Sequence, residues 1–271
     1  MKKFFFLSVA CVLVVSLSGC CLCTTLVQDT TSSVEQLETL PVFTAPVMTE
    51  APETIAPTEP PLPEHSAFYI PGMSVENVIY YFSEVCLDAE YSTGSGNPRL
   101  IQKWTIPIRY RLYGEYTEAD LEIWESFAQW LNSVEGFPGM WPAEEDEMEN
   151  MSVYFCLQDT LVERMGADFY DSDGGVTFWY RDNEIYEATI CYRSDLSQFI
   201  RNSVILEELY NGLGPVQDSN SRPDSVIYSG YSEPQSMTLM DMLIMQLLYH
   251  PDIQCGMDYA ACEAVILSLY Y

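Results

Sequence analysis

The first quarter of the chain limits where a fold can form. Residues 24–66 are rich in Thr, Pro and Glu, and residues 4–98 contain no Lys or Arg. The segment holds seven prolines: Pro41, Pro46, Pro52, Pro57, Pro60, Pro61 and Pro63. Such a composition buries too little apolar surface to offset the entropy lost when a chain becomes ordered. We therefore expect a disordered spacer over residues 20–66 and one globular domain over residues 67–271.

The segment that precedes the spacer is typical of an export signal. Two lysines are followed by an apolar run over residues 4–15, which is too short for a membrane-spanning helix of about 20 residues. The run suits a secretory signal peptide, which is removed after export. It leads into Leu17-Ser18-Gly19-Cys20, which resembles the bacterial lipobox. The resemblance implies that residues 1–19 are cleaved and that Cys20 becomes a lipidated N-terminus; an ordinary signal peptide with a chance cysteine is the alternative.

The lipid anchor would place the domain on the extracytoplasmic face of the cell membrane. Several acyl chains on one cysteine, palmitate among them, hold firmly because each buried CH₂ contributes about 0.8 kcal/mol. A proline-rich chain rises about 3.1 Å per residue, so the spacer would separate the domain from the membrane by on the order of 100 Å. A stalk is the expected role of the spacer, and a proline motif that binds a partner is the alternative.

Charge excludes two classes of partner. Without the two lysines of the signal peptide, nine basic and 40 acidic residues give the chain a net charge of −31. Nucleic acids and anionic lipid surfaces are bound by basic patches, so neither is an expected partner. The run Glu144-Glu145-Asp146-Glu147 is most simply a solvated loop. Residues 171–175 resemble the start of a calcium loop but lack its later ligands, including the Glu at the twelfth position.

The cysteines of the predicted domain indicate neither a zinc site nor a disulfide pattern. No two of them have the CxxC spacing that is typical of zinc binding. Export permits disulfides, but five is an odd number, so at least one thiol stays free. The sequence does not choose a pairing among Cys86, Cys156, Cys191, Cys255 and Cys262.

Capping residues and apolar periodicity predict five helices. Ser74 and Thr117 precede apolar residues at helical spacing. Asp195 with Gln198 resembles a capping box before a long helix, which stops at Gly214. The predicted helices cover about residues 75–86, 118–131, 195–213, 238–249 and 258–269.

Apolar alternation predicts four strands. Pro107 inside the first strand suggests an edge or irregular position, and residues 181–183 form a turn between the last two. The predicted strands cover about residues 104–112, 152–157, 176–180 and 185–192. This order of helices and strands predicts a mixed α/β or α+β domain.

The end of the long predicted helix carries a motif. From Glu207 to Gln217 the sequence reads Glu-Glu-Leu-Tyr-Asn-Gly-Leu-Gly-Pro-Val-Gln. It resembles the metzincin zinc-protease signature HExxHxxGxxH, with the three histidines replaced by Glu207, Asn211 and Gln217. Glu208 matches the general-base glutamate of that signature, and Gly214 matches the glycine that reverses the chain.

Two later segments extend this resemblance. Ser225-Val226-Ile227-Tyr228 resembles the Met-turn of metzincins, with Ile227 in place of methionine. The predicted helix at residues 238–249 resembles the last helix of matrixin-type catalytic domains. The resemblance covers about residues 100–250, and it implies a single α+β domain with a zincin-like mixed sheet and three or more helices.

A closer resemblance is to a bacterial family known as domain of unknown function 2927, whose members are often described as lipoproteins. Family membership implies no known activity. The strand from Lys103-Trp104 to Tyr113 suits the opening of that family. The other matching strings are Glu207-Glu208-Leu209, Leu213-Gly214, Asp218-Ser219, Ser225-Val226-Ile227, Thr238-Leu239, Leu247-Leu248-Tyr249-His250-Pro251 and Gly256-Met257.

The replaced histidines argue against ordinary zinc catalysis. Zinc hydrolases hold the metal with three protein ligands, typically His with a carboxylate, and leave one position for water. This chain has only His65, in the spacer, and His250, at a helix end where it is expected to act as a cap. Asn211 and Gln217 offer neutral oxygens, which suit harder ions better than Zn²⁺. We expect no cofactor, no metal and no residual zinc peptidase.

Two functions compete for this sequence. The favoured one is a membrane-anchored lipoprotein whose zincin-like domain is a pseudoenzyme, serving as a binding or envelope-associated module with an envelope protein or peptide as partner. In that case Glu207, Asn211 and Gln217 should satisfy one another by hydrogen bonds or through water. The alternative is a metal-dependent hydrolase (peptidase) with oxygen ligands and Glu208 as general base. No specific motif supports a third possibility, two catalytic carboxylates that act on glycan.

Overall fold

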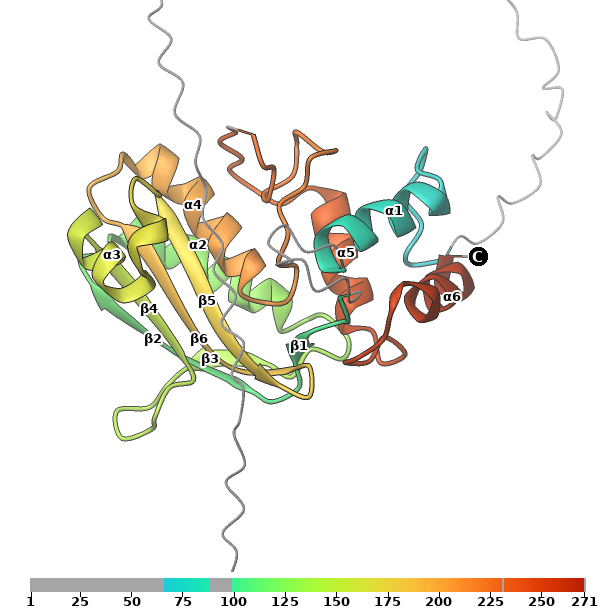
Figure 1. Cartoon of the computed structure of the whole chain (residues 1–271), viewed down its shortest axis with the longest axis horizontal. Helices are drawn as coiled ribbons and strands as arrows, with labels where there is room; N and C mark the ends of the chain where they lie inside the picture. Colours follow the sequence, from blue (N-terminus) through green and yellow to red (C-terminus); the bar gives the residue numbers. More distant parts are fainter. Residues whose placement is uncertain (1–65, 88–98, 231, 271) are drawn as a thin grey trace, which may run out of the picture. The chain divides into compact units, whose positions relative to one another are not determined.

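The computed structural model describes residues 66–87, 99–230 and 232–270, all of which belong to one compact unit (Figure 1). The predicted signal peptide, Cys20 and the spacer up to residue 65 lie outside the described residues. Within those ranges, no helix combines the length and the apolar character needed to cross a bilayer.

Six α-helices and six strands make up this unit. The helices are α1 (Val75–Cys86), α2 (Glu118–Leu131), α3 (Gln158–Met165), α4 (Gln198–Asn211), α5 (Leu239–Tyr249) and α6 (Tyr259–Tyr270). The strands are β1 (Lys103–Trp104), β2 (Ile108–Gly114), β3 (Met140–Pro142), β4 (Met151–Cys156), β5 (Gly174–Arg181) and β6 (Glu184–Arg193).

The strands form one sheet that is mostly parallel. β3, β2, β4 and β6 lie side by side in that order and all run parallel. β1 pairs in parallel with the start of β6, and β5 pairs antiparallel with its other side, so the sheet is mixed. Parallel neighbours require crossover connections, and the chain between β2 and β4 supplies one through α2. The prediction of a single α+β domain with a mixed sheet is confirmed.

The two faces of the sheet are covered by different helices. Alternate residues of a strand point to opposite faces, so Ile190 and Tyr192 of β6 join the main core, whereas Cys191 packs in a small second core with Leu161 and Met165 of α3. Helices α2 and α4 pack on each other, and α4 packs on β5 and β6. Figure 1 shows α1, α5 and α6 grouped beside the sheet.

Two capping residues predicted from sequence, Ser74 and Thr117, begin α1 and α2, and Thr238 begins α5 in the same way. The Ser74 side chain accepts a hydrogen bond from the backbone of Asn77 at the start of α1. Thr117 and Asp120 form a complete capping box at α2, as do Thr238 and Asp241 at α5. Each satisfies backbone N–H groups that the first turn of a helix leaves without partners.

Several boundaries differ from the sequence predictions. The single strand predicted over residues 104–112 is interrupted at residues 105–107, because Pro107 cannot donate to the ladder. Strand β3 and helix α3 were not predicted. β3 has three residues and ends in a proline, and only Leu161 and Met165 of α3 are buried, so neither carries a strong periodic pattern.

The start of α4 also differs from the prediction. Ser197, not Asp195, is the N-cap, and the Asp195 carboxylate instead pairs with Arg193 at 2.8 Å. Gln198 does not complete a capping box; its side chain donates to Asp120 Oδ1 at 2.7 Å. The same oxygen accepts from Arg201 Nε at 2.8 Å in a buried ion pair, which ties α4 to α2.

Candidate functional site

The chain reverses directly after α4, at Gly214. Its φ is +132°, and a Cβ at this position would lie 2.7 Å from the carbonyl oxygen of Gln102 and 2.9 Å from Leu248 Cδ2. Only glycine tolerates both the dihedral angle and the close approach. After the reversal, the backbone N–H groups of Val216 and Gln217 donate to the Val85 carbonyl of α1 at 3.0 and 3.3 Å. The residues after Gly214 are thus held against α1.

The reversal brings five polar residues together: Glu207, Glu208, Asn211, Gln217 and Asp218, which we call the α4 polar cluster. Glu207 is partly buried, and the other four are at most 5% exposed. Asn211 Nδ2 donates to Asp218 Oδ1, and Gln217 Nε2 donates to the Asp218 carbonyl, both at 3.4 Å. Both amides therefore turn their NH₂ groups toward Asp218.

The expectation that Glu207, Asn211 and Gln217 satisfy one another by hydrogen bonds or through water is wrong for direct hydrogen bonds. The described residues show no hydrogen bond among these three side chains. Glu208 Oε2, Asn211 Oδ1 and Gln217 Oε1 are buried and have no hydrogen-bond partner within the part of the chain that the structure describes. A buried polar atom without a partner costs about 1–3 kcal/mol. The cluster therefore lowers the stability of the fold unless a hydrogen-bond donor or a cation contacts these oxygens.

The two glutamates of the cluster have raised pKa values. For Glu208 the main cause is burial, followed by the negative charge of Asp218. For Glu207 burial is again the main cause, and Glu208, Asp218 and Asp173 add to it. None of the ion pairs formed by the described residues includes Glu207 or Glu208. Burial without a basic partner favours the neutral acid, so both glutamates tend to hold a proton.

Glu208 faces the sheet. A Cβ at Gly174, the first residue of β5, would lie 3.0 Å from Glu208 Cγ and 2.6 Å from Val204 Cγ1. The absence of a side chain at Gly174 therefore lets α4 pack closely on β5. In the segment that resembles a calcium loop, Gly174 thus serves helix packing, and Asp173 pairs with Arg193 at 3.4 Å.

The segment that resembles a Met-turn is held by side chains from α1 and α5. Ile227 is fully buried. Ser225 Oγ donates to Asp241 Oδ1 at 2.7 Å and accepts from the Tyr81 hydroxyl at 2.6 Å. The backbone N–H of Ser219 donates to the Ile227 carbonyl at 2.6 Å. Asp241 therefore serves both the cap of α5 and this loop.

A second anchor of the loop was missed in the sequence analysis. Glu84 of α1 is buried and accepts hydrogen bonds from Ser219 Oγ at 3.0 Å, Ser221 Oγ at 2.6 Å and the Asn220 backbone at 2.9 Å. Glu84 lies on an amphipathic helix more than 130 residues earlier, so no local sequence signal points to this role.

The zinc ion implied by the metzincin resemblance does not fit this donor set. Within residues 66–87, 99–230 and 232–270, no group of three or more His, Cys, Asp or Glu side chains is placed to hold a metal. The three histidine positions hold one carboxyl and two amides, and both amides are engaged through their NH₂ groups. His250 lies at the C-cap of α5, and the five cysteines of the domain are unbridged.

Comparison with known proteins identifies the family. The family described as "Protein of unknown function (DUF2927)" matches residues 76–268, well over half of the chain. A comparison with curated proteins gives no match. The matched region runs from α1 into α6 and includes the whole α4 polar cluster. The chain therefore belongs to the DUF2927 family of proteins of unknown function.

Proposed function

We propose that this chain is a lipid-anchored extracytoplasmic protein whose zincin-like domain is a non-catalytic binding module. The observation that carries the proposal is the α4 polar cluster. The side chains at positions 211 and 217 donate to Asp218, and the neighbouring Glu208 is 1% exposed. These side chains have the positions of a hydrolase motif but not the donors or the access that hydrolysis requires.

Four features support a zincin-like fold. The sheet is mixed and mostly parallel, the motif begins on a helix that packs on this sheet, and the chain reverses at Gly214. The segment that contains Ile227 then returns to residue 219, directly after the cluster. This is the order in which the metzincin-like motif would place its ligands, its turn and its Met-turn.

Glu208 is poorly suited to act as a general base. A general base must be unprotonated and must reach the proton that it removes, directly or through one water. Glu208 packs against Gly174 in the interior, and burial raises its pKa. A protonated Glu208 could not accept a proton, and a buried Glu208 could not reach a peptide substrate.

One observation favours the alternative, a hydrolase with oxygen ligands. Three buried oxygens without partners, on Glu208, Asn211 and Gln217, would suit a hard cation. Such an ion would also lower the pKa of the neighbouring carboxyls. We rank this alternative second because access to Glu208 is closed.

Elemental analysis and a peptidase assay test the proposal. The purified wild-type protein should contain no stoichiometric metal and cleave no peptide substrate. The triple variant Glu207→His, Asn211→His, Gln217→His should gain zinc, whereas the single variant Gln217→His should not, because zinc needs three ligands. Stoichiometric metal in the wild type together with peptidase activity would overturn the proposal. A folded triple variant without zinc affinity would contradict the metzincin-like alignment.

A further inference from the structure

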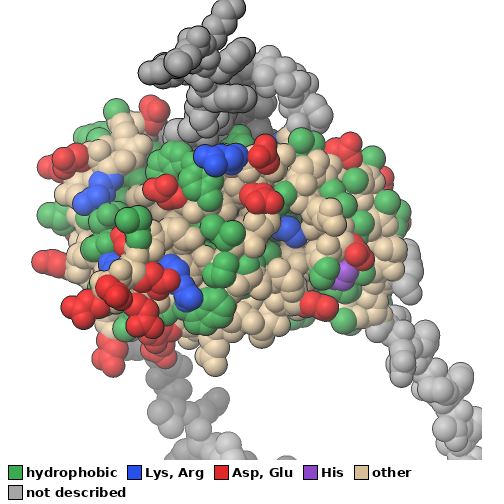
Figure 2. Space-filling view, turned by 90° about the horizontal axis from the view of Figure 1, so that it is seen from below, with side chains coloured by type: hydrophobic (Ala, Val, Ile, Leu, Met, Phe, Trp, Pro, Cys, Tyr) green, Lys and Arg blue, Asp and Glu red, His purple; other side chains and the backbone are tan. Residues whose placement is uncertain are grey.

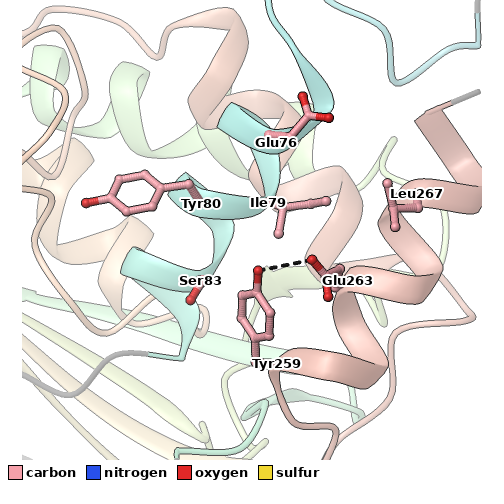
Figure 3. A pocket seen from close by; sticks show the side chains of 7 residues that line it. All are labelled: Glu76, Ile79, Tyr80, Ser83, Tyr259, Glu263 and Leu267. Carbon is pink, nitrogen blue, oxygen red and sulfur yellow. Dashed lines mark hydrogen bonds between the residues drawn. The ribbon is translucent and has the colours of Figure 1, made fainter.

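A groove between α1 and α6 lies apart from the α4 polar cluster (Figure 3). Its volume of 390 Å³ is within the range of about 300–1,000 Å³ that is typical of small-ligand sites. This size accommodates one extended side chain or a small molecule. We call it the α1–α6 groove.

The groove exposes apolar surface. Tyr80 of α1 is 62% exposed, and Tyr259 and Leu267 of α6 are 46% and 39% exposed. Figure 3 shows Ile79 of α1 and Leu267 extending into the space between the two helices. An alkyl chain laid against Leu267 and Tyr259 would remove exposed apolar surface from water.

The groove is also acidic. Glu76 is exposed in the first turn of α1, and Glu263 of α6 accepts a hydrogen bond from the Tyr259 hydroxyl at 3.2 Å. No Lys or Arg is among the described residues that line the groove. The faces of tyrosine rings attract cations, so the aromatic and the acidic side chains favour the same kind of group.

The positive group must come from another molecule. The chain has no Lys or Arg between residues 4 and 98, so the spacer carries no basic side chain. The nine basic residues in the described part all contact a carboxylate, an amide or carbonyl oxygen, or an aromatic ring of this chain. Acidic side chains also gather elsewhere on the surface, at the left edge of the face that Figure 2 draws.

We infer that the α1–α6 groove binds a lysine or arginine side chain on an extended segment of a partner protein. The alkyl stem would lie against Ile79 and Leu267, and the charged head would reach Glu76, Glu263 and the ring of Tyr259. This inference rests on the proposed function, since it names the kind of partner that a non-catalytic module would bind.

Fluorescence anisotropy with the full-length protein in detergent tests the groove. The probe is a labelled Gly/Ser peptide with three lysines, at an ionic strength of about 0.15 M to screen diffuse attraction. The double variant Glu76→Gln, Glu263→Gln should weaken binding about fivefold or more, since two ion pairs are lost. The control Glu122→Gln, Glu125→Gln removes two exposed charges from α2 and should leave the affinity unchanged.

A second pair of variants separates shape from charge. Tyr259→Ala should weaken binding, because it removes the ring that the charged head would reach, whereas Tyr170→Ala, which removes an exposed ring elsewhere, should not. Equal weakening by both double variants, equal binding of a lysine-acetylated peptide, or no binding of the lysine peptide would each overturn the groove assignment. Those results would leave the proposed function standing, whereas cleavage of the peptide would overturn the proposed function.

Discussion

The buried carboxyl of Glu208 should make the stability of the domain depend on pH. Its pKa is raised by burial and by Asp218, whereas an unfolded glutamate titrates near pH 4.3. Between these two pKa values the folded state holds one more proton than the unfolded state. The contribution of Glu208 to the free energy of unfolding is therefore fully present below about pH 4.3. It is lost as the pH rises, by about 1.4 kcal/mol per pH unit for one group.

The variant Glu208→Gln isolates this effect. The amide is nearly isosteric with the neutral acid and has no proton to lose, so the contribution of one group to the slope should vanish. Over two pH units, from about 5 to 7, the free energy of unfolding of the variant should gain up to about 2.7 kcal/mol relative to the wild type. Glu207, with its own raised pKa, should leave a residual slope of the same sign.

Urea unfolding at several pH values, followed by tryptophan fluorescence, measures this difference. The titratable side chains of Cys191 and Tyr192 on β6 should not obscure it, because their pKa values are also raised and lie above this window. The exposed Glu122→Gln serves as the control and should follow the wild type. A wild-type stability that rises from pH 5 to 7, or equal slopes for wild type and Glu208→Gln, would refute the reasoning.

Four further predictions concern the scaffold and the anchor. Asp120→Asn should lower the free energy of unfolding by about 3–5 kcal/mol in chemical denaturation, because it leaves the buried Arg201 without its charged partner; a loss below about 1 kcal/mol would contradict this. Gly214→Ala should destabilise the domain by at least about 1–3 kcal/mol, because the residue has a positive φ and lies against a carbonyl; an unchanged thermal midpoint would argue against a strained reversal. Cys20→Ser should release the protein from the membrane fraction or block its maturation; a mutant that still fractionates as the lipidated form would disprove the anchor. Limited proteolysis of the intact protein should remove residues 24–66 and leave a stable core, and protection of that segment would count against a disordered spacer.

Local signals in the sequence determined the starts of α1 and α2 and the main strands. The caps at Ser74 and Thr117 were predicted because such a side chain accepts a hydrogen bond from a backbone N–H three residues later, and Thr238 follows the same local pattern. The alternation of more and less buried residues in β4 and β6 was predictable from sequence, because one face of each strand enters the main core. The composition likewise predicts that the fold is confined to the region after residue 66, which the proteolysis experiment tests.

Only the tertiary structure decided what the side chains of the candidate site contact. Gln198 carries a helix-start pattern, yet it donates to Asp120, 78 residues away. Glu207, Asn211 and Gln217 were expected to satisfy one another by hydrogen bonds or through water, but the chain reversal at Gly214 brings Asp218 within reach of both amides, which donate to it directly.

The α1–α6 groove was likewise not predictable from local sequence signals. It joins helices that are more than 170 residues apart in the chain, and nothing local to Tyr80 or Tyr259 marks them as neighbours. A cap or a strand pattern is set by atoms within a few residues, so the sequence carries it directly. A buried cluster or a groove depends on which distant segments pack together. The packing of all the core residues determines those contacts.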